Sequence, residues 1–157
     1  MATFSADRSA STLPVFKASG AGILCAAYGT IEIAANPADG DIYEMCRVPA
    51  GAVVVGGMIY ADDLDTGTEA LDMDVGWADN GSDAADPDGF GNLGVWTGDV
   101  TTDVKPVAGN MFNLQGVLLA DGFKTFVNET IIQIEANAAA GTGGTGTLSL
   151  VVHYVNP

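Results

Sequence analysis

The chain has 157 residues, of which 48% are hydrophobic and 16% are charged, so its composition is that of one folded domain and not of a disordered polymer. Its 20 acidic residues greatly outnumber the 5 lysines and arginines, which gives a net charge of −15. Non-specific nucleic-acid binding requires positive charge against phosphates, and anionic membranes repel carboxylates, so the charge excludes both partners. A neutral or basic partner is expected instead.

Residues 1–20 are polar and rich in Ser and Ala, with isolated apolar positions around Pro14. We predict an extended N-terminal arm over residues 1–20 and a β-sandwich domain over residues 21–157, with a frayed terminus as the alternative for the arm. No signal peptide and no apolar stretch of membrane-spanning length is recognisable. The isolated apolar residues of the arm are Phe4, Leu13, Val15 and Phe16.

From Gly22 onward the apolar residues recur with a period of two, which indicates β-strands. Ile31 and Ile33 share one face of the first strand, and residues 52–61 form a buried β-branched run. Residues 41–48 are apolar on both faces apart from Glu44 and Arg47, which leaves the inward side of that strand open. Cys25 and Cys46 lie within such runs and are expected to be buried thiols, with a disulfide between them as the alternative.

The segment Tyr60–Trp77 carries six carboxylates. Its second half alternates apolar and acidic residues, which is typical of a half-buried strand whose aspartates, Asp72 and Asp74, face solvent. The first half is a turn in which aspartates bond to the local backbone. The acidic cluster is thus interpreted mainly as a strand and its turn.

A long connection rich in Gly and Asp follows at residues 78–109, and such loops usually serve a function or make contacts. Its dense carboxylates predict a loop that faces water, while Phe90 and Trp96 need an apolar partner surface, either on their own domain or on a neighbouring molecule. Strands resume at 109–120, 123–129, 130–139 and 146–155. About eight strands and no amphipathic helix predict an all-β antiparallel sandwich or barrel.

Little in the sequence supports catalysis. His153, the single histidine, lies on the outward phase of the last strand and is expected to be a surface or interface residue. Motifs for a nucleophile, a catalytic metal or a phosphate loop are missing, so we predict no enzyme and no cofactor. Calcium is the alternative for the acidic loops, because hard cations take several oxygen ligands. The candidate ligands are Asp63, Asp65, Asn80, Asp83, Asp86 and Asp88.

Three features together resemble the head decoration, or cement, proteins of tailed bacteriophages. They are "VPAG" at 48–51, "DDLDTGT" with its alternating strand at 62–77, and the glycine-rich hairpin before the last strand at 138–155. The resemblance covers roughly residues 22–155. It implies a jelly-roll-like β-sandwich that sits as a homotrimer over threefold and quasi-threefold positions on the outer surface of the virion.

A decoration protein would bind the major capsid protein and bridge capsomers, after synthesis in the host cytoplasm. Under this hypothesis the arm lies on the capsid or on a neighbouring subunit, anchored by its four apolar residues, and Phe90 and Trp96 are further contact candidates. Deletion of residues 2–19 should therefore leave a folded oligomer that no longer decorates heads. The rival interpretation is a carbohydrate- or receptor-binding module, such as a head fibre or tail adhesin. In that case Tyr60, Trp77 and Trp96 would stack on sugars, and calcium would order the acidic loops.

Overall fold

The structure, a computed structural model, describes residues 1–13, 15, 22–92, 94–95, 111–112 and 123–156. Within these residues the chain forms eight β-strands, one short 3-10 helix and no α-helix. In chain order the elements are β1 (Thr3–Ser5), η1 (Asp7–Ser9), β2 (Leu24–Ile33), β3 (Ile42–Val48), β4 (Val53–Ala61), β5 (Asp72–Trp77), β6 (Met111–Phe112), β7 (Thr130–Ala138) and β8 (Gly146–Val155).

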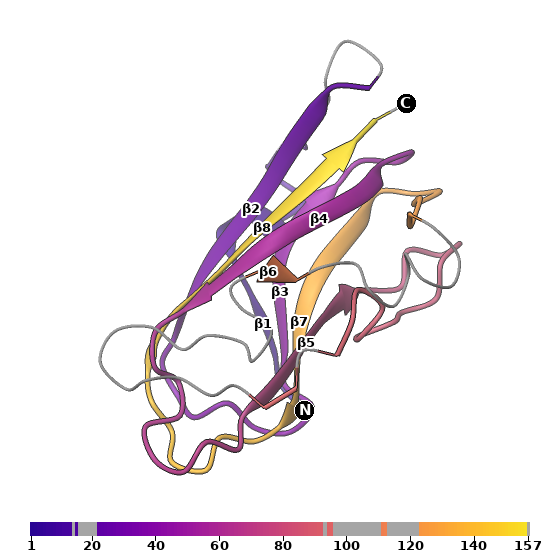
Figure 1. Cartoon of the computed structure of the whole chain (residues 1–157). Helices are drawn as coiled ribbons and strands as arrows, with labels where there is room; N and C mark the ends of the chain where they lie inside the picture. Colours follow the sequence, from indigo (N-terminus) through magenta and orange to yellow (C-terminus); the bar gives the residue numbers. More distant parts are fainter. Residues whose placement is uncertain (14, 16–21, 93, 96–110, 113–122, 157) are drawn as a thin grey trace.

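The described strands form two four-stranded sheets, which lie one in front of the other in Figure 1. One sheet has the order β1-β3-β7-β5 and the other has the order β2-β8-β4-β6. β2 pairs with β8, β3 with β7 and β4 with β6, all antiparallel. The pairs are nested, because the strands before β5 pair in reverse chain order with the strands after it. A nested ribbon wrapped into two sheets is a jelly roll. The predicted jelly-roll-like sandwich is therefore confirmed.

The core lies between the sheets and follows the alternation of the strands. Leu148, Leu150, Val152 and Tyr154 all point inward from β8, as predicted, and are completely buried. The register of β3 against β7 shifts between Glu44 and Cys46, which explains why the apolar residues of β3 do not alternate regularly. At such a bulge two consecutive side chains can be buried, and Met45 and Cys46 both are.

Two of the strands predicted near the end of the chain differ from those in the structure. Residues 123–129 form only a single bridge, between Val53 and Thr125, although Phe126 is completely buried. In the range 109–120 the structure describes a two-residue strand, β6, and the other predicted positions lie outside the described residues.

The first residues of the chain lie against the sandwich. β1 pairs in parallel with β3, and the Phe4 ring stacks on Tyr43 at 5.2 Å between centroids. Ala6 and Ser9 are buried. Part of the predicted arm is thus an edge strand of the domain itself.

Candidate interaction surfaces

The two outer faces of the sandwich differ in chemistry. The outward side chains of β2, β8 and β4 form rows across the sheet, and four consecutive rows carry no charged residue on these strands. We call this surface the neutral face. Its residues are Leu24, Ala26, Tyr28 and Thr30 of β2; Ser149, Val151, His153 and Val155 of β8; and Val53, Gly56, Met58 and Tyr60 of β4.

Charges begin at the margins of the neutral face. In the next row the Thr147 hydroxyl donates to Glu32 at 3.1 Å, and the Thr147 N–H donates to Asp62 at 2.8 Å. At the free side of β2, Arg8 donates to the Tyr28 hydroxyl at 2.9 Å, and its guanidinium lies 4.9 Å from the centroid of the Tyr28 ring. The face is therefore an uncharged strip with an acidic end and a basic flank.

The opposite face, on β3, β7 and β5, carries carboxylates. Glu135 of β7 lies between β3 and β5, and burial, followed by repulsion from Asp39 and Asp88, raises its pKa. Burial, then a hydrogen bond and repulsion from Asp88, likewise raises the pKa of Asp86. Like charges crowd each other on this side of the molecule.

The prediction that Asp72 and Asp74 face solvent is wrong for Asp74, which is buried, and Asp72 is half-buried. The chain after Trp77 doubles back along β5, with bridges from Trp77 to Asp86 and from Asp72 to Val95, and covers the side that the aspartates point to. Asn92 and Asn137 donate to the Asp74 carboxylate at 3.4 and 3.3 Å. Burial raises the pKa of Asp72.

Asp65 is buried as well, in the turn whose aspartates were predicted to bond to the local backbone. Its carboxylate accepts four backbone N–H groups at 2.7 to 3.0 Å, from Ala70, Leu71, Gly141 and Thr142. Burial alone would raise the pKa of Asp65, but these hydrogen bonds outweigh it and hold the pKa below its ordinary value. Asp65 thus joins the turn before β5 to the hairpin before β8.

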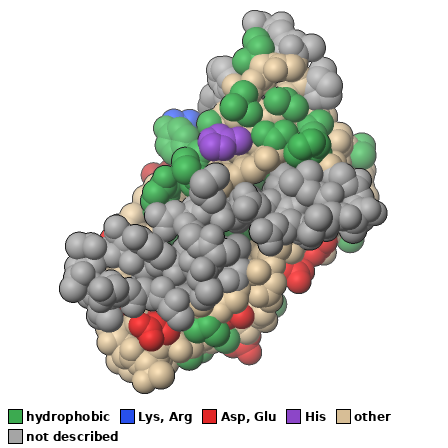
Figure 2. All heavy atoms as spheres, in the orientation of Figure 1, with side chains coloured by type: hydrophobic (Ala, Val, Ile, Leu, Met, Phe, Trp, Pro, Cys, Tyr) green, Lys and Arg blue, Asp and Glu red, His purple; other side chains and the backbone are tan. Residues whose placement is uncertain are grey.

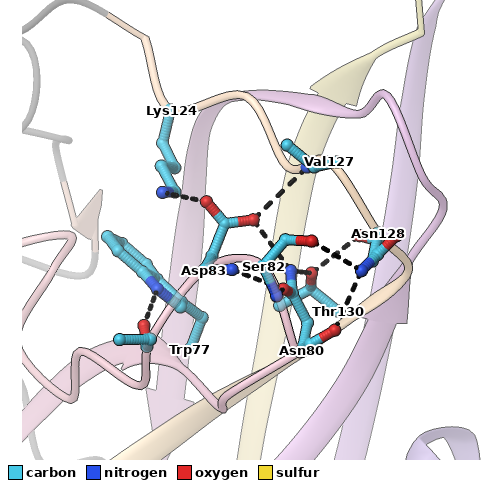
Figure 3. A network of polar contacts seen from close by, with 9 residues as sticks. Trp77, Asn80, Ser82, Asp83, Lys124, Val127, Asn128 and Thr130 are labelled. Carbon is cyan, nitrogen blue, oxygen red and sulfur yellow. Dashed lines mark hydrogen bonds and ion pairs between the residues drawn. The ribbon is translucent and has the colours of Figure 1, made fainter.

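A polar network joins the 79–83 turn to the segment before β7 (Figure 3). Lys124 pairs with Asp83 at 2.7 Å, and the same carboxylate accepts from Asn80 at 2.9 Å and from the Val127 N–H at 3.3 Å. These contacts, the bond from Lys124 first, lower the pKa of Asp83. The Lys124 ammonium also lies 4.8 Å from the Trp77 ring centroid, so it covers the aromatic core at this end of the sandwich.

Replacing Lys124 with methionine is expected to lower the free energy of unfolding by about 2 kcal/mol, since it leaves a mostly buried carboxylate without its cation. The methionine preserves much of the apolar stem that packs on Trp77. Urea unfolding followed by circular dichroism measures the loss. The double variant with Asp83→Asn should recover part of it, and a single variant as stable as the wild type would contradict the assignment.

The structure gives the calcium hypothesis no ligand cluster, because no three His, Cys, Asp or Glu side chains of the described residues are arranged to hold a metal ion. Two of the candidate ligands, Asp65 and Asp83, are instead occupied by N–H donors and an ammonium group. Those donors satisfy a carboxylate in the way that a cation otherwise would.

The predicted contact residues lie in different environments. Leu13 is 37% exposed, and Phe4 is exposed although its ring stacks on Tyr43. Val15 is half-buried beside Arg8 and Tyr28. Phe90 is completely buried and packs edge-on against Trp77, so its side chain belongs to the core and cannot reach another protein. Phe16 and Trp96 lie outside the described residues.

The residues proposed for sugar stacking do not form a platform within the described chain. Trp77 is buried, and its indole N–H donates to the Ala84 carbonyl at 2.9 Å. Tyr60 is exposed on the neutral face, and its hydroxyl donates to the Met58 sulfur. A buried indole and a distant tyrosine offer no paired aromatic surface.

The two cysteines and the histidine lie in the environments predicted for them. Cys25 and Cys46 are buried free thiols, and burial raises the pKa of Cys46 to about 12. His153 lies on the outward phase of β8 and is half-buried. Among the described residues, no helix is long and apolar enough to cross a membrane.

Solved structures with the same fold come from phage capsids. The chain superposes on one from the "Capsid of Ralstonia phage GP4" with a TM-score of 0.67 and 22% identity, over 99% of both chains. It matches one from the "Cyanophage Pam1 capsid asymmetric unit" with a TM-score of 0.56 and 19% identity, over 94% of this chain and 97% of that one.

A chain from the "Acidic stable capsid structure of Helicobacter pylori bacteriophage KHP30" matches with a TM-score of 0.54 and 15% identity, over 87% of this chain and 90% of that one. No protein-family model and no curated protein matches the sequence. At these identities the similarity shows a shared fold, and it extends over nearly the whole length of each chain.

Proposed function

We propose that this chain is a structural virion protein that decorates the outside of a phage capsid and stabilises it by bridging capsomers as a homotrimer. The observation that carries the proposal is the fold shared, almost end to end, with chains from three phage capsids. The motifs of the sequence that resemble decoration proteins favour the same role. Its partners would be the major capsid protein and further copies of itself, with no enzymatic activity and no cofactor.

The chemistry of the surfaces supports a position on the exterior. An acidic molecule avoids packaged DNA, since its carboxylates repel the phosphates. A clamp across neighbouring capsomers adds buried surface that must be separated before the shell opens. An interface of about 800 Å² per partner binds tightly when its centre is well packed, and many identical copies act together.

The test mixes purified protein with heads that lack it. We expect saturable binding that EDTA does not change, and decorated heads should retain their DNA to a higher temperature than bare ones. Heads that bind nothing would contradict the proposal. Glycan binding that disappears with EDTA would instead identify the carbohydrate-binding module.

The role of the arm is better tested by substitution than by deletion of residues 2–19, because the deletion would remove β1 and expose Tyr43. Leu13→Ser should weaken binding to heads by about tenfold, as expected for loss of an apolar anchor. Phe123→Ser is the matched control, since it also removes an exposed apolar side chain, outside the arm. Equal binding by both variants would refute the contact at Leu13.

A further inference from the structure

The neutral face is unusual for the outer side of a sheet. The solvent side of an antiparallel sheet is normally polar, yet here Leu24 is 61% exposed, Tyr28 52% and Tyr60 46%. Between them the central strand presents Val151 and His153. In Figure 2 hydrophobic side chains surround the histidine in the upper half of this view, and acidic ones lie lower down.

We propose that the neutral face is the surface on which copies of this chain bind one another. The inference deepens the function proposed above, because it names the surface that would hold the oligomer together. It rests on the contrast between the net charge of −15 of the chain and the four rows of the strip, in which β2, β8 and β4 place no charged residue.

Electrostatics favours a second copy as the occupant. Two copies repel wherever their carboxylates are apposed, and the acidic face, with Glu135 and Asp88, is therefore suited to a basic partner and unsuited to another copy. On the neutral face the apposed side chains are apolar or hydroxylic, apart from the His153 imidazole, which is counted as neutral at pH 7. Charges beyond about 8 Å are largely screened at physiological salt, so contact there avoids most of the repulsion.

The size and margins of the face fit the centre of such an interface. From Leu24 to Thr30 the strip extends about 20 Å along the strands, and its three strands make it about 15 Å wide. That area is a part of the roughly 800 Å² per partner in a standard interface, whose centre is depleted of charge and whose rim is polar. Arg8 at one margin and Glu32 and Asp62 at another offer opposite charges for the rim.

The first experiment measures the mass of the purified full chain by light scattering across a range of concentrations. Wild type should exceed the 15.9 kDa monomer mass, and Val151→Glu should weaken association about 100-fold or more, because it buries a carboxylate in the uncharged centre of the interface. Ile131→Glu is the matched control. It places the same residue at a half-buried, outward, β-branched position of the central strand of the other sheet, and it should associate like wild type.

A monomeric wild type, or equal association by the two variants, would overturn the proposal. If wild type is monomeric and Val151→Glu loses binding to heads, the neutral face belongs to the capsid contact, and the decoration function stands without this inference. A dimer that Val151→Glu dissociates would support the inference and contradict the trimer.

A second measurement needs no variant. His153 is the only histidine in the chain and lies in the middle of the neutral face, so its acylation by diethyl pyrocarbonate reports on that surface alone. We expect modification to slow at least about tenfold as the protein concentration rises through the association range. A rate independent of concentration, in a protein shown to be oligomeric, would place the interface elsewhere.

Discussion

Replacing Asp65 with asparagine, which keeps the shape of the side chain, is expected to lower the free energy of unfolding by about 4 kcal/mol. The wild-type carboxylate accepts four backbone N–H groups and is almost fully buried. Three of these N–H groups bond to one oxygen and Thr142 to the other, so an amide that keeps its oxygen at the first position places its NH2 group against the Thr142 N–H, which then has no acceptor. The other three bonds lose the negative charge of their acceptor. Each hydrogen bond to a charged group contributes about 1.5–3 kcal/mol.

Asp63→Asn is the control for this substitution. Asp63 is half-buried two residues earlier and accepts one N–H, from Asp65, at 3.2 Å, a bond that an asparagine oxygen also makes. Chemical denaturation should show a loss below about 0.5 kcal/mol for the control. Similar losses for the two variants would mean that the four N–H groups do not converge on Asp65.

The effect of Asp65→Asn should also depend on pH. The folded-state pKa of Asp65 is lowered, so its carboxylate contributes stability that is complete above the unfolded pKa of about 3.9 and is lost as the pH falls through the folded value. The difference in unfolding free energy between wild type and variant should therefore be full at pH 5 and above, and should shrink below about pH 4.

The sequence predicted the strands well because their cores depend on local alternation. The inward residues of β8 are read directly from a period of two, and they lie where expected. The order of the strands was not readable from the pattern, since it depends on which segments meet in space. The jelly-roll connection was implied only by the resemblance to decoration proteins.

The aspartates show where local patterns fail. Asp74 has the spacing of a solvent-facing strand residue and Asp65 lies in a local turn, but segments far away in the chain bond to both. Thr142 and Asn137, which supply donors, are separated from them by 77 and 63 positions. No pattern within the acidic stretch reports such donors.

The neutral face left a weak signal that was not recognised. The outward phase of β8, namely Ser149, Val151, His153 and Val155, contains no acidic residue in a chain with 20 of them. The sequence of β8 alone does not indicate an interaction surface. The register places Tyr28 and Met58 on either side of Val151, and this pairing joins three uncharged segments into one surface.

The close approach of the two sheets at Gly29 gives the second large prediction. Gly29 of β2 points inward, and a Cβ atom there would overlap the backbone carbonyl of Met45 in β3, which belongs to the other sheet. Backbone atoms cannot relieve the overlap by a change of rotamer, so Gly29→Ala must push the two sheets apart. We expect a loss of about 3 kcal/mol and a melting temperature lower by roughly 10 °C.

Gly81→Ala is the control for Gly29→Ala, because the added Cβ would meet nothing within 4 Å in an exposed turn and only the positive φ of 83° opposes it. Its loss should be less than half as large. Since Leu24 and Tyr28 of the neutral face lie on the same strand as Gly29, displacement of β2 should also weaken association of the copies. A Gly29→Ala variant with the melting temperature of the wild type would contradict the close contact between Gly29 of β2 and the Met45 carbonyl of β3.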